Sequence, residues 1–175
     1  MKVSQLADVV RALLSPSHIR HRFSSLGHTM YEHVVWRFTM RHGRGLRVHP
    51  TASIRYPRNV TVGDNSHINM YCSVWAGEKS RITLGDNLLM GPCVQIYAGK
   101  HGIRLGELMT SQPRVYEDTT IGNDVWLCGG CVVTGGVKIA DGVVVAANAV
   151  VTRDITEANS IVAGVPAKVI GKRQP

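Results

Sequence analysis

The sequence predicts an all-β solenoid, in which short strands and tight corners stack in successive coils. The first observation is an aliphatic residue at every sixth position without a break: Ile121, Leu127, Val133, Ile139, Val145 and Val151. The second is a small or β-branched residue two positions before each of these: Thr119, Val125, Cys131, Val137, Val143 and Ala149. Neither the helical period of about 3.6 residues nor strand alternation alone produces this pattern, and a fixed longer period is typical of solenoids. We therefore expect three six-residue units to close one triangular coil of about eighteen residues.

The same repeat extends upstream, with three interruptions. Its corners share an aliphatic residue, a glycine and Asn or Asp, as in Val62-Gly63-Asp64-Asn65, Leu84-Gly85-Asp86-Asn87 and Ile121-Gly122-Asn123-Asp124. Asn and Asp suit such corners because they tolerate left-handed backbone angles. The repeat gains about two residues near 56–59 and about four near 77–80, and it stops from about 97 to 120. We expect this last segment to protrude as a loop, and surface loops on a rigid scaffold often carry function.

A basic, partly helical appendage is predicted for residues 1–47, ahead of the solenoid domain at 48–172. The appendage contains eight Lys and Arg residues against Asp8 and Glu32, so it accounts for six of the eight net positive charges of the chain. Aliphatic residues at helical spacing mark one face of a first helix: Val3, Leu6, Val10, Leu13 and Leu14. That helix should end at Ser15-Pro16, because proline does not continue a helix interior, and a second helical stretch is expected at about 31–42.

Three roles are open for this appendage: a helix pair that caps the end of the solenoid, a basic surface near anionic lipid, and nucleic-acid binding. No nucleic-acid fold signature accompanies the charge, so a nucleic-acid partner is not expected. Asp8 and Arg11 interrupt the first apolar stretch, which argues against a secretory signal, and no uncharged run reaches transmembrane length. The expected compartment is the cytoplasm, with peripheral membrane contact through residues 1–47 as an open alternative.

The pair Cys128-Gly-Gly-Cys131 has the spacing of redox and metal sites. The repeat, however, assigns both cysteines to positions where small residues recur, and no second pair completes a zinc site. We therefore interpret these cysteines as small structural residues, with a redox or metal role as the alternative.

Three runs in the C-terminal half resemble the hexapeptide-repeat acyltransferases, whose fold is a left-handed parallel β-helix. They are Ile121-Gly-Asn-Asp-Val-Trp126-Leu, Val145-Ala-Ala-Asn-Ala-Val-Val-Thr-Arg-Asp154 and Ile161-Val-Ala-Gly-Val-Pro-Ala-Lys-Val-Ile170. The resemblance covers about 48–172 and is strongest to the maltose, galactoside and nodulation acetyltransferases, to which the polysaccharide O-acetyltransferases are related. It implies a homotrimer with active sites between subunits, which transfers an acetyl group from acetyl-CoA to a hydroxyl, less often an amine, without a metal.

The resemblance places a histidine general base on the excursion loop, just after a coil strand. In Ile96-Tyr97-Ala98-Gly99-Lys100-His101 this position is His101. Histidine suits the task because its ordinary pKa is near neutrality. The family pattern often shows Thr or Gly before the histidine and Pro after it, whereas this chain has Lys100 and Gly102 there. The group that orients the imidazole is open between Glu107 and a main-chain carbonyl.

The positions that match the family's CoA contacts are Trp126, Gly129, Ala147, Thr152, Arg153 and Lys168. Gly129 and Ala147 are small enough to let the pantetheine arm reach main-chain amides, and Trp126 is expected to wall the site. Arg153 and Lys168, with Lys172 or Arg173 as further candidates, are cations that can meet the nucleotide phosphates.

The acceptor end departs from the branch that acetylates simple sugars. Its Asn-aromatic-Asn stretch corresponds to Asn69-Met70-Tyr71, so that tyrosine replaces the second asparagine. Asn69, Tyr71, Trp75 and Tyr97 are the candidate acceptor residues, and their rings predict a stacking site for a sugar. We expect the acceptor to be a sugar or glycan in polysaccharide biosynthesis, such as capsule, O-antigen or exopolysaccharide.

Alternatives to this function remain. N-acetylation of an amino-sugar nucleotide differs only in the acceptor atom. A zinc carbonic anhydrase on the same scaffold needs three histidines, and beside His67 and His101 the third is missing. A non-catalytic sugar-binding scaffold predicts no effect of His101 beyond local packing.

Overall fold

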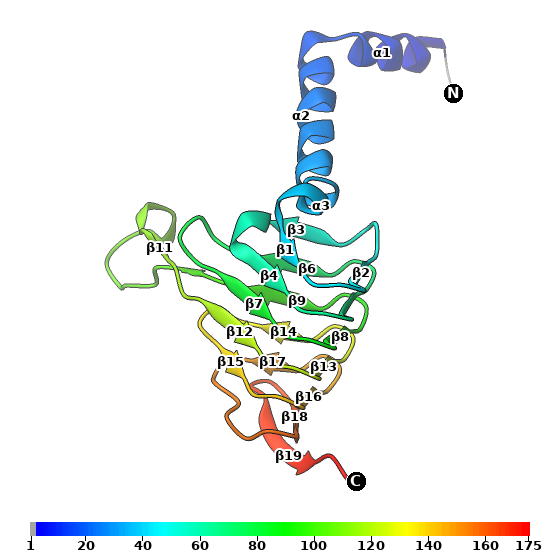
Figure 1. Ribbon diagram of the computed structural model, residues 1–175. Helices are drawn as coiled ribbons and strands as arrows, with labels where there is room; N and C mark the ends of the chain where they lie inside the picture. Colours follow the sequence, from blue (N-terminus) through cyan, green and yellow to red (C-terminus); the bar gives the residue numbers. More distant parts are fainter. Residues whose placement is uncertain (1–2) are drawn as a thin grey trace.

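Three parallel β-sheets form the walls of a left-handed β-helix in the computed structural model, which describes residues 3–175 (Figure 1). The first sheet contains β1 (Arg41–His42), β4 (Val60–Val62), β7 (Ile82–Leu84), β12 (Thr119–Ile121) and β15 (Lys138–Ile139). The second contains β2 (Arg47–Val48), β5 (His67–Ile68), β8 (Leu89–Met90), β13 (Trp126–Leu127), β16 (Val144–Val145), β18 (Ser160–Ala163) and the antiparallel β19 (Lys168–Lys172). The third contains β3 (Ser53–Arg55), β6 (Ser73–Trp75), β9 (Gln95–Tyr97), β14 (Val132–Val133) and β17 (Val150–Val151).

The strand register confirms the predicted coil length. Thr120 pairs with Lys138, Trp126 with Val144, and Val132 with Val150, in each case eighteen residues later. The two short interruptions are also confirmed, since Arg41 pairs with Thr61, twenty residues later, and Thr61 with Thr83, twenty-two residues later. The first extra residues form the short 3₁₀ helix η1 (Pro57–Asn59).

Asn and Asp occupy the corners for the predicted reason. Asn65, Asn87 and Asp124 have φ angles of 55°, 56° and 53°, in the left-handed region that these side chains tolerate. The glycine of the corner is needed for close approach between coils. A Cβ at Gly63 would lie 2.6 Å from the main-chain nitrogen of Asp86, so the coils could not stack at their present spacing.

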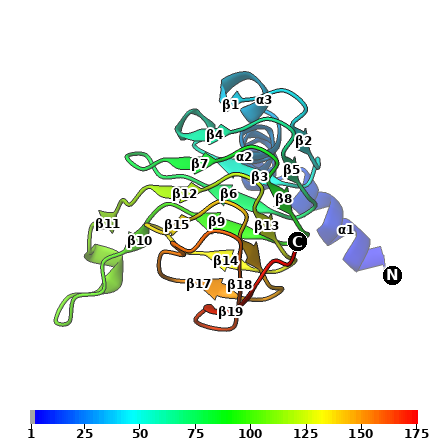
Figure 2. The same cartoon turned by 60° about the horizontal axis from the view of Figure 1, so that its bottom comes forward.

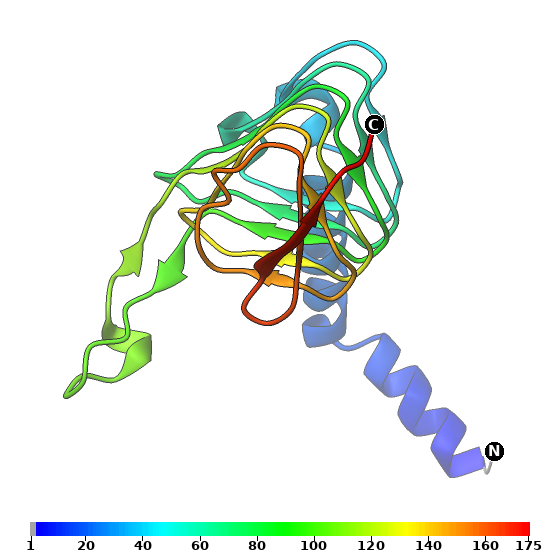
Figure 3. The same ribbon diagram turned by 90° about the horizontal axis from the view of Figure 1, so that it is seen from below.

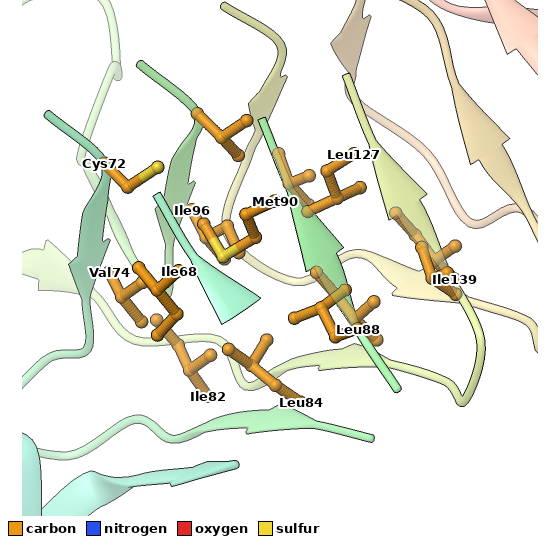
Figure 4. Close-up of a cluster of buried hydrophobic side chains, with 14 of the residues drawn as sticks. Ile68, Cys72, Val74, Ile82, Leu84, Leu88, Met90, Ile96, Leu127 and Ile139 are labelled. Atoms are coloured by element: carbon orange, nitrogen blue, oxygen red, sulfur yellow. The ribbon is translucent and has the colours of Figure 1, made fainter. Parts of the chain in front are cut away.

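The inward side chains fill the prism with stacked aliphatic residues (Figure 4). Ile68, Met90, Leu127 and Val145 are fully buried on the second sheet, and each continues the column of the previous coil. Because apolar burial stabilises a fold in proportion to the area removed from water, this continuous column is the main support of the scaffold.

The appendage differs from the prediction in its second helix. Helix α1 (Val3–Leu13) ends as expected before Ser15-Pro16. Helix α2 (Pro16–His33) then starts at the proline, and the Ser15 side chain caps it by accepting a hydrogen bond from the His18 amide (3.2 Å). The predicted range 31–42 contains only the last three residues of α2 and the short α3 (Trp36–Thr39), because β1 already begins at Arg41, seven residues before the expected start of the solenoid at 48.

The end of α2 and α3 close the first coil, where Trp36 and Met40 are buried. Helix α1 and the beginning of α2 instead extend beyond the solenoid (Figures 1 and 3). Among residues 3–175, no helix has the length and apolar character needed to cross a membrane.

Candidate active site

The excursion loop protrudes from the solenoid, as predicted, and the structure shows that it forms a hairpin (Figure 2). Strand β10 (Lys100–His101) pairs antiparallel with β11 (Arg114–Val115), which places His101 opposite Arg114, and a short 3₁₀ helix η2 (Met109–Ser111) lies near the tip. The buried Gln112 side chain holds the loop together, since it accepts from the Arg104 amide (2.7 Å) and donates to the carbonyls of Arg104 (2.8 Å) and Glu107 (3.0 Å). The hairpin is therefore an ordered platform for His101.

A cavity of about 650 Å³ lies between this hairpin, the third sheet and helix α2. Its lining includes His101, the predicted base, together with Trp75 and Tyr97, two of the predicted acceptor residues. Lys100 and Arg114 of the hairpin also line it, so two cationic side chains share the cavity with the imidazole. A cavity of this size is in the range of ligand sites.

Two aromatic rings form one wall of the cavity because Trp75 and Tyr97 are neighbours in the register of β6 and β9. Their centroids are 5.6 Å apart in an edge-to-face arrangement. The Trp75 indole donates to the Ser53 hydroxyl (2.9 Å), and the Arg55 guanidinium lies 3.7 Å from the centre of the indole. Burial raises the pKa of the Tyr97 phenol, although the charge of Arg55 opposes this, so the phenol is neutral at physiological pH.

Helix α2 contributes to the same cavity, which the sequence reasoning missed. Glu32 accepts hydrogen bonds from the Ser53 hydroxyl (2.6 Å) and the Arg55 guanidinium (2.6 Å), and thereby ties the helix to the third sheet beside Trp75. His28 and Tyr31 of the same helix also line the cavity. The available signal was that Glu32 is the only acidic residue between Asp8 and Asp64.

The carboxyl of Glu32 is charged over the whole neutral range. Burial alone would raise its pKa, but the hydrogen bonds from Ser53 and Arg55, together with the charge of Arg55, outweigh burial and lower the pKa. Because its pKa is lowered, the charged carboxylate stabilises the packing of α2 against the third sheet fully at any pH above its ordinary pKa of about 4.3. This stabilisation is lost as the pH falls through the lower pKa that Glu32 has in the folded state.

Replacing Glu32 with glutamine is expected to loosen α2 at neutral pH. Amide exchange in residues 26–33, corrected for the intrinsic rate, should accelerate about tenfold, because a hydrogen bond to a charged group contributes about 1.5–3 kcal/mol and Arg55 is partly exposed. The wild type should show the same change only on acidification below pH about 4. Asp8→Asn is the matched control, since Asp8 has no ion pair within residues 3–175. Unchanged exchange in Glu32→Gln would contradict this role.

A second cavity of about 680 Å³ lies on the other side of Lys100 and contains Thr152 and Arg153. Lys100 pairs with Glu117 (2.9 Å) between the two cavities, whereas Arg153 has no acidic partner within the described residues. Lys168 on β19 is exposed. The further candidates Lys172 and Arg173 are already paired, with Glu157 (2.6 Å) and Asp124 (2.7 Å).

Four other predicted site residues lie away from His101 within one chain. Asn69, Tyr71, Gly129 and Ala147 occupy the corner between the second and third sheets, whereas Trp75, Tyr97 and Thr152 lie at the opposite edge of the third sheet. Tyr71 is exposed with a φ of 55°, at the left-handed corner position, and its amide donates to the Thr51 hydroxyl (3.0 Å).

Trp126 is 47% exposed on the outer face of the second sheet, between Leu89 and Val144. The predicted site residues of one chain therefore fall into two groups, one beside His101 and one at the far corner of the third sheet.

The His101 side chain is exposed and makes no hydrogen bond within residues 3–175. Glu107, one of the two groups considered for orienting it, pairs instead with Arg104 (3.4 Å).

The thiols of the Cys128-Gly-Gly-Cys131 pair are held in their protonated form. Burial, with smaller effects of Cys128 and Cys72, raises the pKa of Cys131 to about 12, and burial also raises the pKa of Cys128. A protonated, buried thiol is a poor nucleophile and a poor metal ligand, so the small-residue interpretation fits the geometry. Among residues 3–175, no group of three His, Cys, Asp or Glu side chains is arranged to hold a metal ion.

Comparisons with known proteins agree with this architecture. A family model described as bacterial transferase hexapeptide (six repeats) matches residues 118–153. The chain is 33% identical to galactoside O-acetyltransferase of Escherichia coli K12 over 128 residues, which cover 73% of this chain and 61% of that protein. It is also 33% identical to nodulation protein L of Rhizobium meliloti over 151 residues, covering 78% of this chain and 75% of that protein.

A solved structure of galactoside acetyltransferase in complex with coenzyme A superposes with a TM-score of 0.69 at 29% identity, covering 90% of this chain and 72% of that one. The chain spans 61% and 62% of the lengths of the first two curated relatives.

Proposed function

The chain belongs to the hexapeptide-repeat acyltransferases, and on that premise we propose that it transfers an acetyl group from acetyl-CoA to a sugar hydroxyl, with His101 as the general base. The observation that carries the proposal is the cavity in which His101 shares a space with the rings of Trp75 and Tyr97. A base and an acceptor platform in one cavity are what such a transfer requires.

In the proposed reaction the two substrates react directly, without a covalent enzyme intermediate. The His101 imidazole removes the acceptor hydroxyl proton, and the oxygen attacks the thioester carbonyl to form a C–O bond. The tetrahedral intermediate then expels the CoA thiolate as the C–S bond breaks, and the imidazolium returns the proton to sulfur. No cysteine is needed as a nucleophile, which agrees with the raised pKa of Cys128 and of Cys131.

Two main-chain amides at the corner between the second and third sheets support a donor site there. The neighbouring amides are engaged, since Cys128, Gly130, Ala146 and Asn148 all donate to carbonyls of adjacent turns. The amides of Gly129 and Ala147 donate to no group within the described residues. Free amides at small residues suit the carbonyls of a pantetheine arm, or an oxyanion. Lys168 and Arg153, which have no acidic partner within the described residues, suit phosphates, and Arg153, at the opposite edge of the third sheet, would reach this donor site only from a neighbouring subunit.

The separation of the nominated residues supports an active site shared between subunits. His101 and the free amides lie at opposite edges of the third sheet, so one chain cannot present both to the same acetyl group. In a homotrimer, the His101 edge of one subunit would face the Gly129 and Ala147 corner of its neighbour. Trp126, exposed on the outer face of the second sheet, would then wall the same groove.

The proposed acceptor is a sugar or glycan in polysaccharide biosynthesis. Trp75 and Tyr97 offer apolar ring surface at one end of the cavity, and Arg55 and Arg114 offer hydrogen-bond donors. Asn69 and Tyr71 line the other edge and would reach the acceptor only from a neighbouring subunit.

Replacing Trp75 with alanine is expected to raise the acceptor KM about tenfold and to leave the Kd for CoA unchanged. An aromatic contact contributes about 0.5–1.5 kcal/mol beyond its buried area, and about 1.4 kcal/mol corresponds to tenfold. Trp75→Phe retains a ring and should lose less. Phe38→Ala is the control, because Phe38 is an exposed aromatic residue outside the cavity. Equal KM values for wild type and Trp75→Ala would show that the indole ring of Trp75 does not contact the acceptor.

Thiol release from acetyl-CoA over a panel of sugars, sugar nucleotides and polysaccharide fragments tests the proposed function. Release that depends on one class of acceptor would establish the transfer and identify the substrate class. Silence across the panel, combined with no calorimetric signal on titration with CoA, would favour a non-catalytic scaffold.

A further inference from the structure

The N-terminal arm, defined as residues 3–30, leaves a row of apolar side chains uncovered. The arm comprises α1 and most of α2 and projects from the end of the solenoid (Figures 1 and 3). Its exposed apolar residues, each between 46% and 72% accessible, are Leu6, Val9, Val10, Leu13, Leu14, Ile19, Phe23, Leu26 and Met30. A contiguous apolar surface of this kind marks an interaction site more often than a chance feature.

These residues are gathered on one side of each helix. On α1, Asp8 and Arg11 occupy the opposite side from Leu6, Val10 and Leu13. On α2, the apolar residues form a single stripe with spacings of four, three and four: Ile19, Phe23, Leu26 and Met30. Helical periodicity places them on one face of the helix, so the arm is amphipathic along its whole length.

The polar side of the arm is cationic. Arg11, Arg20 and Arg22 oppose only Asp8, and none of the four forms an ion pair within residues 3–175. Helical geometry puts Arg20 on one flank of the stripe and Arg22 on the other. A second copy of the arm packed on this stripe would bring these like charges together, whereas an anionic surface would neutralise them.

The arm is fixed to the scaffold at only one end. The Ser15 cap and Pro16 set the bend between the two helices, and the contacts of Glu32 with Ser53 and Arg55 hold the far end of α2 on the third sheet. Helix α1 lies across the tip of the molecule, away from the hairpin loop (Figures 1 and 3). Its apolar face is therefore free to enter a flat interface.

We infer that the N-terminal arm docks the protein on an anionic lipid surface. The apolar stripe enters the boundary between headgroups and acyl chains, and the arginines meet the lipid phosphates. His28, Tyr31 and Glu32, which line the His101 cavity, lie by helical spacing on the side of α2 away from the stripe, so docking would hold that cavity about one helix diameter, about 10 Å, from the lipid surface. This consequence, which rests on the proposed function, points to an acceptor that is itself attached to lipid.

Vesicle co-sedimentation of the full chain tests the inference without acetyl-CoA or an acceptor, so it remains informative if the proposed transfer fails. Vesicles of phosphatidylcholine with phosphatidylglycerol should sediment the protein, and vesicles of phosphatidylcholine alone should not. The double variant Leu13→Asp/Phe23→Asp should reduce binding at least about tenfold, because charges replace two residues that enter the interface. Leu105→Asp is the matched control, since Leu105 is fully exposed on the hairpin loop.

Three results would overturn the inference: no binding to either vesicle, equal binding to both, or equal binding by the double variant and the wild type. The oligomeric state is measured in parallel by sedimentation. A smaller assembly for the double variant would assign the stripe to contact between copies of the chain instead of lipid. An unchanged assembly and circular dichroism spectrum, with lost vesicle binding, supports the lipid surface.

Discussion

Replacing His101 with alanine is expected to lower kcat by about 10²- to 10⁴-fold, the usual contribution of a positioned general base. The variant should bind CoA with the Kd of the wild type, because the donor site is proposed at Gly129, Ala147 and Arg153. Its fold should persist, since His101 is exposed and lies on a hairpin held by Gln112. The measurement is the steady-state rate of acceptor-dependent thiol release beside calorimetric titration with CoA.

His42→Ala is the matched control for this variant. His42 is exposed at the end of β1, before the corner between the first and second sheets, and does not line the His101 cavity, so its removal should leave kcat within about twofold, as for surface substitutions in general. A His101→Ala rate close to that of His42→Ala would exclude His101 as the base. Detection of an acetylated cysteine by mass spectrometry would contradict direct transfer between the two substrates.

Replacing Leu127 with alanine is expected to destabilise the protein by about 2–5 kcal/mol, the range for removing a buried leucine side chain. Leu127 is fully buried on β13 and stacks between Met90 of the coil before and Val145 of the coil after. The void left by the smaller side chain would interrupt the aliphatic column and weaken the packing of β13, the strand that also contains Trp126. The measurement is the free energy of unfolding in urea at a fixed protein concentration, because the stability of an oligomer depends on concentration.

Leu105→Ala provides the control for the same chemical change at an exposed position. Leu105 is fully exposed at the tip of the hairpin, and its loss should change the free energy of unfolding by less than about 0.5 kcal/mol. Similar unfolding energies for the two variants would mean that the aliphatic column is not the main support of the scaffold.

The solenoid could be predicted from sequence because its determinants are local and periodic. Each inward position, such as Leu127 or Val145, recurs at six residues, and each corner needs Asn, Asp or Gly for its own backbone geometry. The register of eighteen residues then follows by counting, and so does the place of the excursion loop. His101 could be predicted because the family resemblance places a histidine on the excursion loop, and Trp75 and Tyr97 because their rings suit a sugar, whereas their meeting in one cavity became visible only in the structure.

The missing parts of the prediction depend on contacts between distant segments. The pairing of Glu32 with Arg55 joins a helix to a strand twenty-three residues later, and no repeat records it. Helix α2 was placed too late because histidine, serine and glycine dilute its apolar stripe, while the Ser15-Pro16 start was interpreted only as the end of α1. The proposed relation of His101 to Gly129 and Ala147 spans two subunits, and contacts between subunits cannot be derived from the sequence or from a single chain.

The most direct test of the central claim is mass spectrometry of the acceptor after incubation with acetyl-CoA and either the wild type or His101→Ala. The account predicts that one class of sugar or glycan gains a single acetyl group with the wild type, as an ester that mild base removes, and that the variant leaves it unmodified. Equal acetylation of the acceptor by both proteins would contradict the account, because the reaction would then proceed without the base assigned to the cavity.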